Sequence, residues 1–110
     1  QYGWPGDTIT TRLPPWDSAE GMAARWQAFG WNTLLINGHD YGQIIGACEQ
    51  ALAHKNQPTI IIASTVKGHG VSFMAGAYEW HAKVPTADEL AWAMRELSEE
   101  KKGEPDDDGN

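Results

Sequence analysis

The chain has 110 residues and a formal net charge of -7 at pH 7, from 8 Lys and Arg against 15 Asp and Glu. This length suffices for one domain with a single hydrophobic core, and the acidic balance argues against a general nucleic-acid-binding protein, which usually presents a basic face. No apolar run approaches the roughly 20 residues of a membrane-spanning helix, and the single cysteine, Cys48, excludes an internal disulfide and suits a reducing compartment such as the cytoplasm.

Residues 1–16 are expected to be an irregular loop segment. They begin with Gln1 and read QYGWPGDTITT, in which glycine and proline recur and no periodic apolar pattern is present. We therefore expect the chain to be a segment of a longer polypeptide or one product of its cleavage. The alternative is that the boundary at Gln1 was introduced artificially.

A first helix is predicted from Asp17 to about Phe29. Asp17 offers an N-cap, and Glu20 stands three positions on, as a capping box requires. Gly30 suits the position just past the helix end, where a left-handed backbone is common. Apolar residues recur at helical spacing and make one face: Met22, Ala23, Trp26 and Phe29.

A strand, a helix and a second strand are predicted next. Residues 31–37 have a continuous apolar centre, which is typical of a strand buried on both faces of a parallel sheet. Asp40, with Gln43 at the capping-box position, starts a helix that runs to about residue 54. Residues 59–66 form the second apolar strand, and this order is one crossover unit with parallel pairing. The helix should turn these residues inward: Ile44, Ile45, Cys48, Ala51 and Leu52.

Residues 67–85 are predicted to be a long loop, and Thr86 then caps a last helix with Glu89 in the reciprocal position. That helix is expected to end near residue 97, because the sequence from 98 onward is charged and bears glycine. Residues 98–110 are predicted to be an acidic, flexible tail. The inward stripe of the helix should consist of Leu90, Ala93, Met94 and Leu97.

The predicted fold class is α/β, a parallel sheet with flanking helices. Two parallel strands have two open edges, and strands this apolar need neighbours and helices on both faces. The fold should therefore be partial, completed by upstream sequence or by another chain.

Lys67 is the first candidate functional residue. It follows the second strand, and ligands of open parallel sheets bind at the carboxyl ends of strands. Gly68 and Gly70 allow a sharp turn and a close approach of backbone to ligand. A lysine ammonium there could neutralise a phosphate, but a solvated lysine at a strand boundary is the plainer alternative.

The histidines are the other candidates. His81 follows Trp80 and could move a proton or donate a hydrogen bond to an oxyanion, or it could simply pack beside the tryptophan. His69 lies close to Lys67 in sequence and could line the same ligand site at the end of the strand. His39 suits a turn, and His54 suits a helix end. No histidines or carboxylates have the spacing of a zinc site, and an inward-facing Cys48 would not be a nucleophile.

The order of these features resembles the carboxyl-terminal half of the thiamine-diphosphate-binding domain of transketolases. Four stretches carry the resemblance: WQAFGW at 26–31, INGHD at 36–40, PTIIIASTVKGHGVSF at 58–73 and EWHAKVPTADEL at 79–90. It covers residues 17–97 in unbroken order. Deoxyxylulose-phosphate synthases and other thiamine-dependent enzymes share parts of this frame, but the Trp-His-x-Lys-x-Pro run is closer to transketolase.

The resemblance implies a reaction and a set of roles. The reaction is transfer of a two-carbon ketol unit from a ketose to an aldose, for which thiamine diphosphate supplies the carbanion. Lys67 is expected near the cofactor. His81 is expected to contact cofactor and sugar substrate and to act in catalysis. His69 stands where the family varies, so it is expected to tune which sugar fits, with a solvent-facing loop residue as the alternative.

The resemblance also implies partners. The family's Gly-Asp-Gly motif and metal-binding asparagine lie upstream of the matched region, so the ligands of Mg²⁺ are expected outside this chain. The family places the activating glutamate on a separate pyrimidine-binding domain. The chain should therefore act, as part of a hetero-oligomer, only with the missing half of its domain and a pyrimidine-binding domain or subunit, on sugars or sugar phosphates. A non-catalytic interaction subunit, or another thiamine-dependent enzyme such as a deoxyxylulose-phosphate synthase, is the alternative.

Overall fold

The computed structural model describes residues 16–103. The chain divides into two compact units, with the boundary between Thr65 and Val66, and each is described by itself. The expected irregular segment up to residue 15 and the last seven residues of the expected tail lie outside the described residues.

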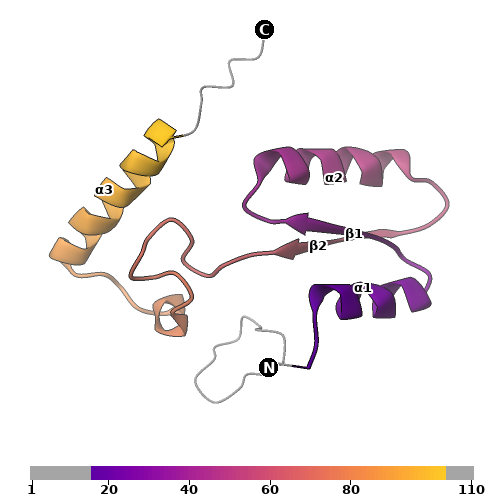
Figure 1. The fold of residues 1–110 in the computed structure, drawn as a ribbon, viewed down its shortest axis with the longest axis horizontal. Helices are drawn as coiled ribbons and strands as arrows, with labels where there is room; N and C mark the ends of the chain where they lie inside the picture. The colour runs from indigo at the N-terminus through magenta and orange to yellow at the C-terminus, as the bar shows by residue number, and fades with distance from the viewer. Residues whose placement is uncertain (1–15, 104–110) are drawn as a thin grey trace, which may run out of the picture. The chain divides into compact units, whose positions relative to one another are not determined.

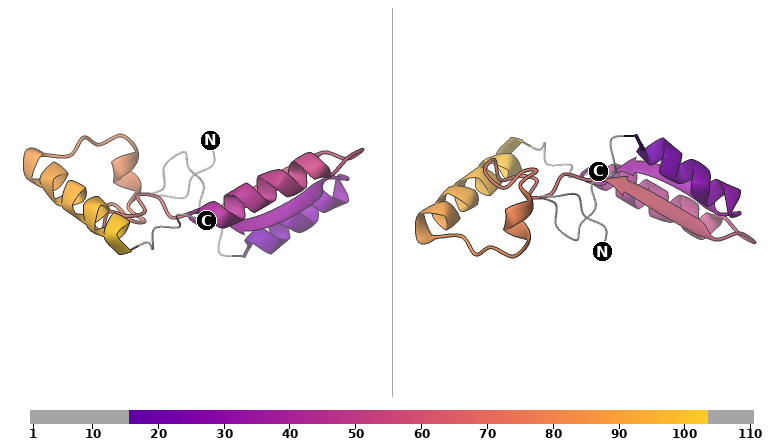
Figure 2. Two further views of the ribbon diagram at one scale, coloured as in Figure 1. Left: turned by 90° about the horizontal axis from the view of Figure 1, so that it is seen from above. Right: turned by 90° about the horizontal axis from the view of Figure 1, so that it is seen from below.

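The first unit is a helix–strand–helix–strand unit with a two-stranded parallel sheet. Its elements are α1 (Ala19–Ala28), β1 (Asn32–Asn37), α2 (Tyr41–Ala53) and β2 (Thr59–Ser64). The strands pair in register from Asn32 opposite Thr59 to Asn37 opposite Ser64. The two helices lie on opposite sides of the strands (Figure 1) and run along their length (Figure 2). The α/β class and the parallel pairing are confirmed.

The second strand ends at Ser64, two residues earlier than predicted. The reason is its partner: β1 ends at Asn37, which pairs with Ser64. Thr65 and Val66 follow the last paired residue, so β1 offers them no further strand residues to pair with.

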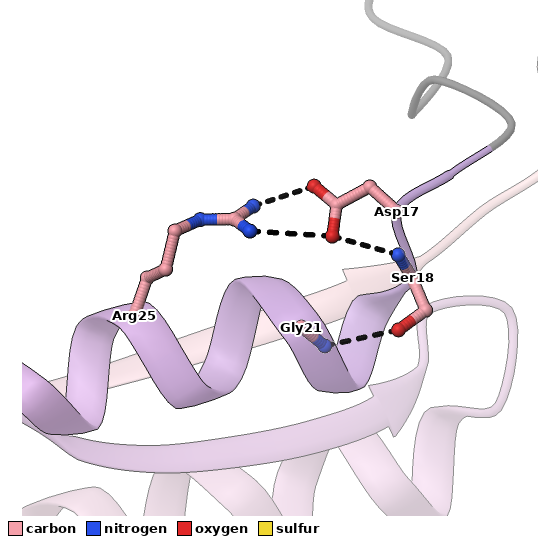
Figure 3. Close-up of polar contacts among 4 residues, drawn as sticks. All are labelled: Asp17, Ser18, Gly21 and Arg25. Atoms are coloured by element: carbon pink, nitrogen blue, oxygen red, sulfur yellow. Dashed lines mark hydrogen bonds and ion pairs between the residues drawn. The ribbon is translucent and has the colours of Figure 1, made fainter.

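The N-cap of α1 is Ser18, so the predicted capping box of Asp17 and Glu20 is wrong by one position. The Ser18 hydroxyl accepts a hydrogen bond from the Gly21 N–H at 3.0 Å. Asp17 instead accepts from two Arg25 nitrogens, at 2.6 and 3.3 Å, and from the Ser18 N–H at 2.8 Å (Figure 3). Cap and ion pair together fix how the chain enters the helix.

The C-terminus of α1 is closed by Gly30, as predicted. Its φ of +88° is left-handed, its N–H donates to the Gln27 carbonyl at 2.9 Å, and the Trp31 N–H donates to the Trp26 carbonyl at 3.1 Å. These are the two bonds of a Schellman motif. The Trp26 and Trp31 rings meet edge to face, 4.9 Å apart, and supply the apolar contact that often accompanies the motif.

The N-cap of α2 is Asp40, as predicted, and its carboxylate accepts from the Gln43 N–H at 3.0 Å. The Gln43 side chain does not complete a capping box. Its Oε1 accepts from the N–H of Asn37 at 2.7 Å, while its Nε2 donates to Asp40. Gln43 therefore ties the start of α2 to the end of β1.

The second unit contains a run of turns over residues 67–76, a short 3₁₀ helix, η1 (Tyr78–His81), and α3 (Ala87–Gly103). The capping box at Thr86 is confirmed: the Glu89 carboxylate accepts from the Thr86 N–H at 2.8 Å, and the Thr86 hydroxyl from the Glu89 N–H at 3.3 Å. The predicted end of this helix near residue 97 is wrong. Residues 98–103 are rich in Glu and Lys, which are good helix formers, so their charge does not end the helix.

The inward faces predicted for the helices are only partly correct. The buried residues are small: Ala23, Ala47, Val71 and Ala93. On α2, Cys48 and Ile45 are exposed and Leu52 is 74% exposed, and Phe29 after α1 is 83% exposed. On α3, Leu90, Met94 and Leu97 are exposed as well. Two strands offer each helix of the first unit a narrow surface, so much of its apolar face remains uncovered. None of the described helices is both long and apolar enough to cross a membrane.

Candidate functional site

The turn segment, residues 67–76, begins at Lys67 and is closed on itself. The Gly76 N–H donates to the Lys67 carbonyl at 2.7 Å. Gly68 has φ +70°, and a Cβ at this position would lie 2.5 Å from the Met74 carbonyl oxygen. Only glycine fits that close approach without displacing the backbone. The predicted need for a sharp turn after Lys67 is thus confirmed at Gly68.

His81 is the last residue of η1 and is exposed. Trp80 beside it packs edge to face on Phe73 of the turn segment, with ring centroids 5.4 Å apart. The Lys83 ammonium lies 4.3 Å from the centre of the Trp80 ring, a cation–π distance. The segment that carries His81 is therefore packed against the segment that begins at Lys67. Convergence of the two side chains on one ligand stays a prediction.

Two other features of the second unit were not identified from the sequence. The Glu96 carboxylate accepts from the Ser72 N–H at 2.6 Å, from the Ser72 hydroxyl at 2.5 Å and from the Trp92 indole N–H at 3.0 Å. These donors, first the hydroxyl and then the amide of Ser72, hold the pKa of Glu96 below its ordinary value. Phe73 also packs on Trp92, 5.6 Å between ring centroids. Of these contacts, the sequence indicates only the one between Trp92 and Glu96, because residues four positions apart lie on the same face of a helix.

His39 and His54 lie in a turn and at a helix end, as expected, whereas the role of His69 beside Lys67 stays a prediction. His69 is exposed, and its N–H donates to the Val66 carbonyl at 3.1 Å. The N–H of His39 donates to the Asn37 side chain at 3.0 Å within the turn after β1. His54 follows α2 and shares a hydrogen bond of 2.8 Å with Gln57, whose amide donates to the Gly30 carbonyl.

The first unit has a hollow of about 310 Å³ at the carboxyl ends of its strands, where open parallel sheets bind ligands. None of the predicted site residues Lys67, His69 and His81 lines it. The lining residues come from the starts of both helices and the ends of both strands: Ala19, Glu20, Leu35, Ile36, Asn37, Gln43 and Ser64.

The positive charge of Lys67 is the feature of the turn segment that is compatible with the anionic part of thiamine diphosphate. Residues 67–78 contain no Asp or Glu, so the turn segment itself carries no negatively charged side chain. Gly76 at the end of the turn segment is exposed, and glycine permits a close approach of backbone to a ligand. Across residues 16–103, no group of three or more His, Cys, Asp or Glu could hold a metal ion.

Comparison with known proteins gives a consistent result. The family model described as "Transketolase, thiamine diphosphate binding domain" matches residues 15–103. An apulose-4-phosphate transketolase subunit of Phocaeicola vulgatus is 43% identical over 82 residues, which cover 74% of this chain and 29% of that protein. The 6-deoxy-6-sulfo-D-fructose transketolase subunit SqwG of a Clostridium species is 34% identical over 94 residues, 86% of this chain and 33% of that protein.

A third relative, transketolase-like protein 1 of Bos taurus, is 39% identical over 92 residues, 84% of this chain and 15% of that protein. The chain thus spans a third or less of the length of these relatives. The family match, however, extends over both described units, from the residue before the described part to the last residue of α3. The chain therefore belongs to the transketolase family, as part of its thiamine-diphosphate-binding domain.

Proposed function

We propose that this chain is part of a thiamine-diphosphate-dependent, transketolase-like transferase that moves a two-carbon ketol unit from a ketose to an aldose. Family membership over residues 15–103 is the observation that carries this proposal. Two relatives whose names describe parts of transketolases support it. The packing of Phe73 on Trp80 supports it independently, because it joins the segments that bear Lys67 and His81.

Lys67 and His81 have the leading roles. The Lys67 ammonium supplies a positive charge for the cofactor's diphosphate. His81 contacts cofactor and sugar, and its imidazole donates a hydrogen bond to, or exchanges a proton with, a substrate oxygen. The cofactor, when bound, supplies the carbon nucleophile of ketol transfer. His81 is thus the catalytic residue of this chain, and both residues bind the cofactor.

His69 is proposed to act on substrate choice. It lies two positions from Lys67 in the turn segment and is exposed, so it can meet a sugar without disturbing the fold. Names of the relatives include a phosphorylated and a sulfonated sugar, and an imidazole suits such anionic groups. In a His69→Lys variant, acceptor preference across neutral and phosphorylated sugars should change. Unchanged preference would remove this role.

The proposed partners are the rest of the thiamine-diphosphate-binding domain and a pyrimidine-binding domain or subunit, in a hetero-oligomer in the cytoplasm. The word "subunit" in the names of two relatives supports a divided enzyme. The small core supports partners too, since large apolar side chains such as Leu52 and Phe29 are exposed. Mg²⁺ would then bind to ligands elsewhere in the assembly.

The test uses the assembled enzyme with thiamine diphosphate and Mg²⁺. His81→Ala should lower kcat for ketol transfer by about 100-fold or more, as loss of general acid–base catalysis does. Lys67→Ala should mainly weaken cofactor binding. If both variants keep wild-type activity and cofactor affinity, the catalytic assignment fails and a non-catalytic interaction role is favoured. A panel of ketose phosphates against pyruvate with glyceraldehyde phosphate separates transketolase from deoxyxylulose-phosphate synthase chemistry.

A further inference from the structure

Glu96 joins two parts of the second unit that are distant in sequence. Both of its carboxylate oxygens are occupied: one by the Ser72 N–H, the other by the Ser72 hydroxyl and the Trp92 indole N–H. The contact to Ser72 spans 24 residues, so it does not shape α3 itself. It ties the turn segment to the helix. Hydrogen bonds to an ionised group are about twice as strong as neutral ones.

Ser72 lies inside the closed turn that begins at Lys67. The Val71 carbonyl accepts from the N–H groups of Met74 and Ala75, both at 3.0 Å, and the Lys67 carbonyl accepts from Gly76. The backbone between these bonds has little freedom. A restraint on Ser72 is therefore also a restraint on the backbone of Lys67.

Phe73, the residue after Ser72, extends the connection to the segment of His81. Its ring lies against Trp80, which precedes His81, and against Trp92, which Glu96 also holds. Phe73 thus lies where the turn segment, η1 and α3 meet, and Glu96 holds both its neighbour Ser72 and its ring partner Trp92. Loosening Glu96 would release both segments that carry the proposed cofactor-binding residues.

We propose that Glu96 is a positioning residue for cofactor binding: its carboxylate, through Ser72 and Trp92, holds Lys67 and His81 where they meet thiamine diphosphate. The inference rests on the proposed function and deepens it. Glu96 itself touches neither cofactor nor substrate in this scheme. By ordering the turn segment before the cofactor binds, Glu96 reduces the loss of conformational entropy on binding.

The test measures thiamine diphosphate affinity of the assembled enzyme by titration calorimetry at fixed Mg²⁺. Glu96→Gln puts an amide N–H₂ where a carboxylate oxygen faced a donor, so at least one of the three bonds is lost. Loss of one such bond should weaken cofactor binding about three- to tenfold. The value of kcat at saturating cofactor should change less than about twofold, because binding restores the arrangement. Glu99→Gln, an exposed carboxylate on the same helix, is the matched control.

A double-mutant cycle with Lys67→Ala distinguishes positioning from general stabilisation. If Glu96 acts through Lys67, the effect of Glu96→Gln on cofactor affinity should be smaller in the Lys67→Ala background. Full additivity, or an affinity equal to that of Glu99→Gln, would overturn the inference while leaving the proposed function intact. Should Lys67→Ala and His81→Ala themselves leave binding and activity unchanged, it is the proposed function that fails.

Two further variants keep the test decisive if Glu96→Gln does not assemble. Ser72→Ala removes only the hydroxyl donor, and Trp92→Phe removes only the indole N–H while keeping an aromatic ring against Phe73. Each should weaken cofactor binding about two- to fivefold, as expected for one hydrogen bond. Wild-type affinity in both variants would contradict the inference.

Discussion

Phe73 packs edge to face on Trp80, with ring centroids 5.4 Å apart, and this contact holds η1 against the turn segment. A second ring, Trp92 of α3, lies 5.6 Å from Phe73 on the same cluster. Such aromatic pairs contribute about 0.5–1.5 kcal/mol each beyond the area that they bury. The single side chain of Phe73 thus connects three segments.

Phe73→Ala should therefore lower the free energy of unfolding of the assembled enzyme by about 1–3 kcal/mol, from the loss of two ring contacts. It should also lower kcat, because η1 is no longer held and His81 loses its fixed position. Urea unfolding and steady-state kinetics measure the two effects. Phe73→Tyr keeps the ring and is the control. Normal kcat together with normal cofactor affinity in a destabilised Phe73→Ala enzyme would show that the cluster serves stability alone.

Gly68 and Gly46 make a matched pair for a test of backbone geometry. Gly68→Ala forces a side chain into φ +70° and against the Met74 carbonyl, so it should cost about 2 kcal/mol or more and weaken cofactor binding. Gly46 lies in α2 with open space at its Cβ position, so Gly46→Ala should stabilise by about 0.5–1 kcal/mol. Chemical unfolding curves of both variants give the comparison. Equal effects would contradict the close approach at Gly68.

Local signals in the sequence predicted local structure well. Thr86 with Glu89, Asp40 and Gly30 mark helix ends because each signal acts within one turn of helix. Ser18 and Asp17 are both able to cap, and the choice depends on Arg25, which takes Asp17 as its partner. Two adjacent residues that can cap therefore leave a one-residue ambiguity, which the ion pair between Asp17 and Arg25 resolves.

Contacts between residues distant in sequence could not be predicted from the spacing of apolar and capping residues. The bond between Ser72 and Glu96 spans 24 residues, and no periodicity encodes which turn meets which helix. The prediction of the buried helix faces was partly wrong for another reason. Apolar spacing indicates the face that a helix would bury, but Ile45 and Leu52 extend beyond the cover that two strands give. The positions of Lys67 and His81 in one compact unit follow from the chain order, whereas their joint contact with a cofactor stays a prediction.

At the N-terminus of α1, the contribution of the Ser18 cap to stability can be measured apart from that of the Asp17–Arg25 ion pair. Ser18→Ala removes the side-chain acceptor of the Gly21 N–H and should cost about 1 kcal/mol, as N-cap loss usually does. Ser18→Asp keeps an acceptor at the cap and should restore most of that loss. Thermal or urea unfolding of the intact protein measures both. A neutral Ser18→Ala variant would show that the bond from the Gly21 N–H to the Ser18 hydroxyl does not stabilise the helix.

The stability of the protein should fall in acid partly through Asp17 and Glu96. The side-chain hydrogen bond from Arg25, followed by the backbone N–H of Ser18, holds the pKa of Asp17 below its ordinary value of 3.8, and Ser72 does the same for the pKa of Glu96, below 4.5. A carboxylate with a lowered pKa in the folded state stabilises above its unfolded pKa, and this contribution disappears as the pH falls through the folded pKa.

The expected loss thus lies at and below the ordinary pKa values of the two groups, and it should be absent near neutral pH. Asp17→Asn and Glu96→Gln cannot ionise, so each should be less stable than the wild type at pH 7 and should approach it as the pH falls. Urea unfolding between about pH 6 and pH 3 measures the difference, with Glu99→Gln as the control. A constant difference across this range would show that these carboxylates stabilise the fold in some way other than as acceptors in their charged form.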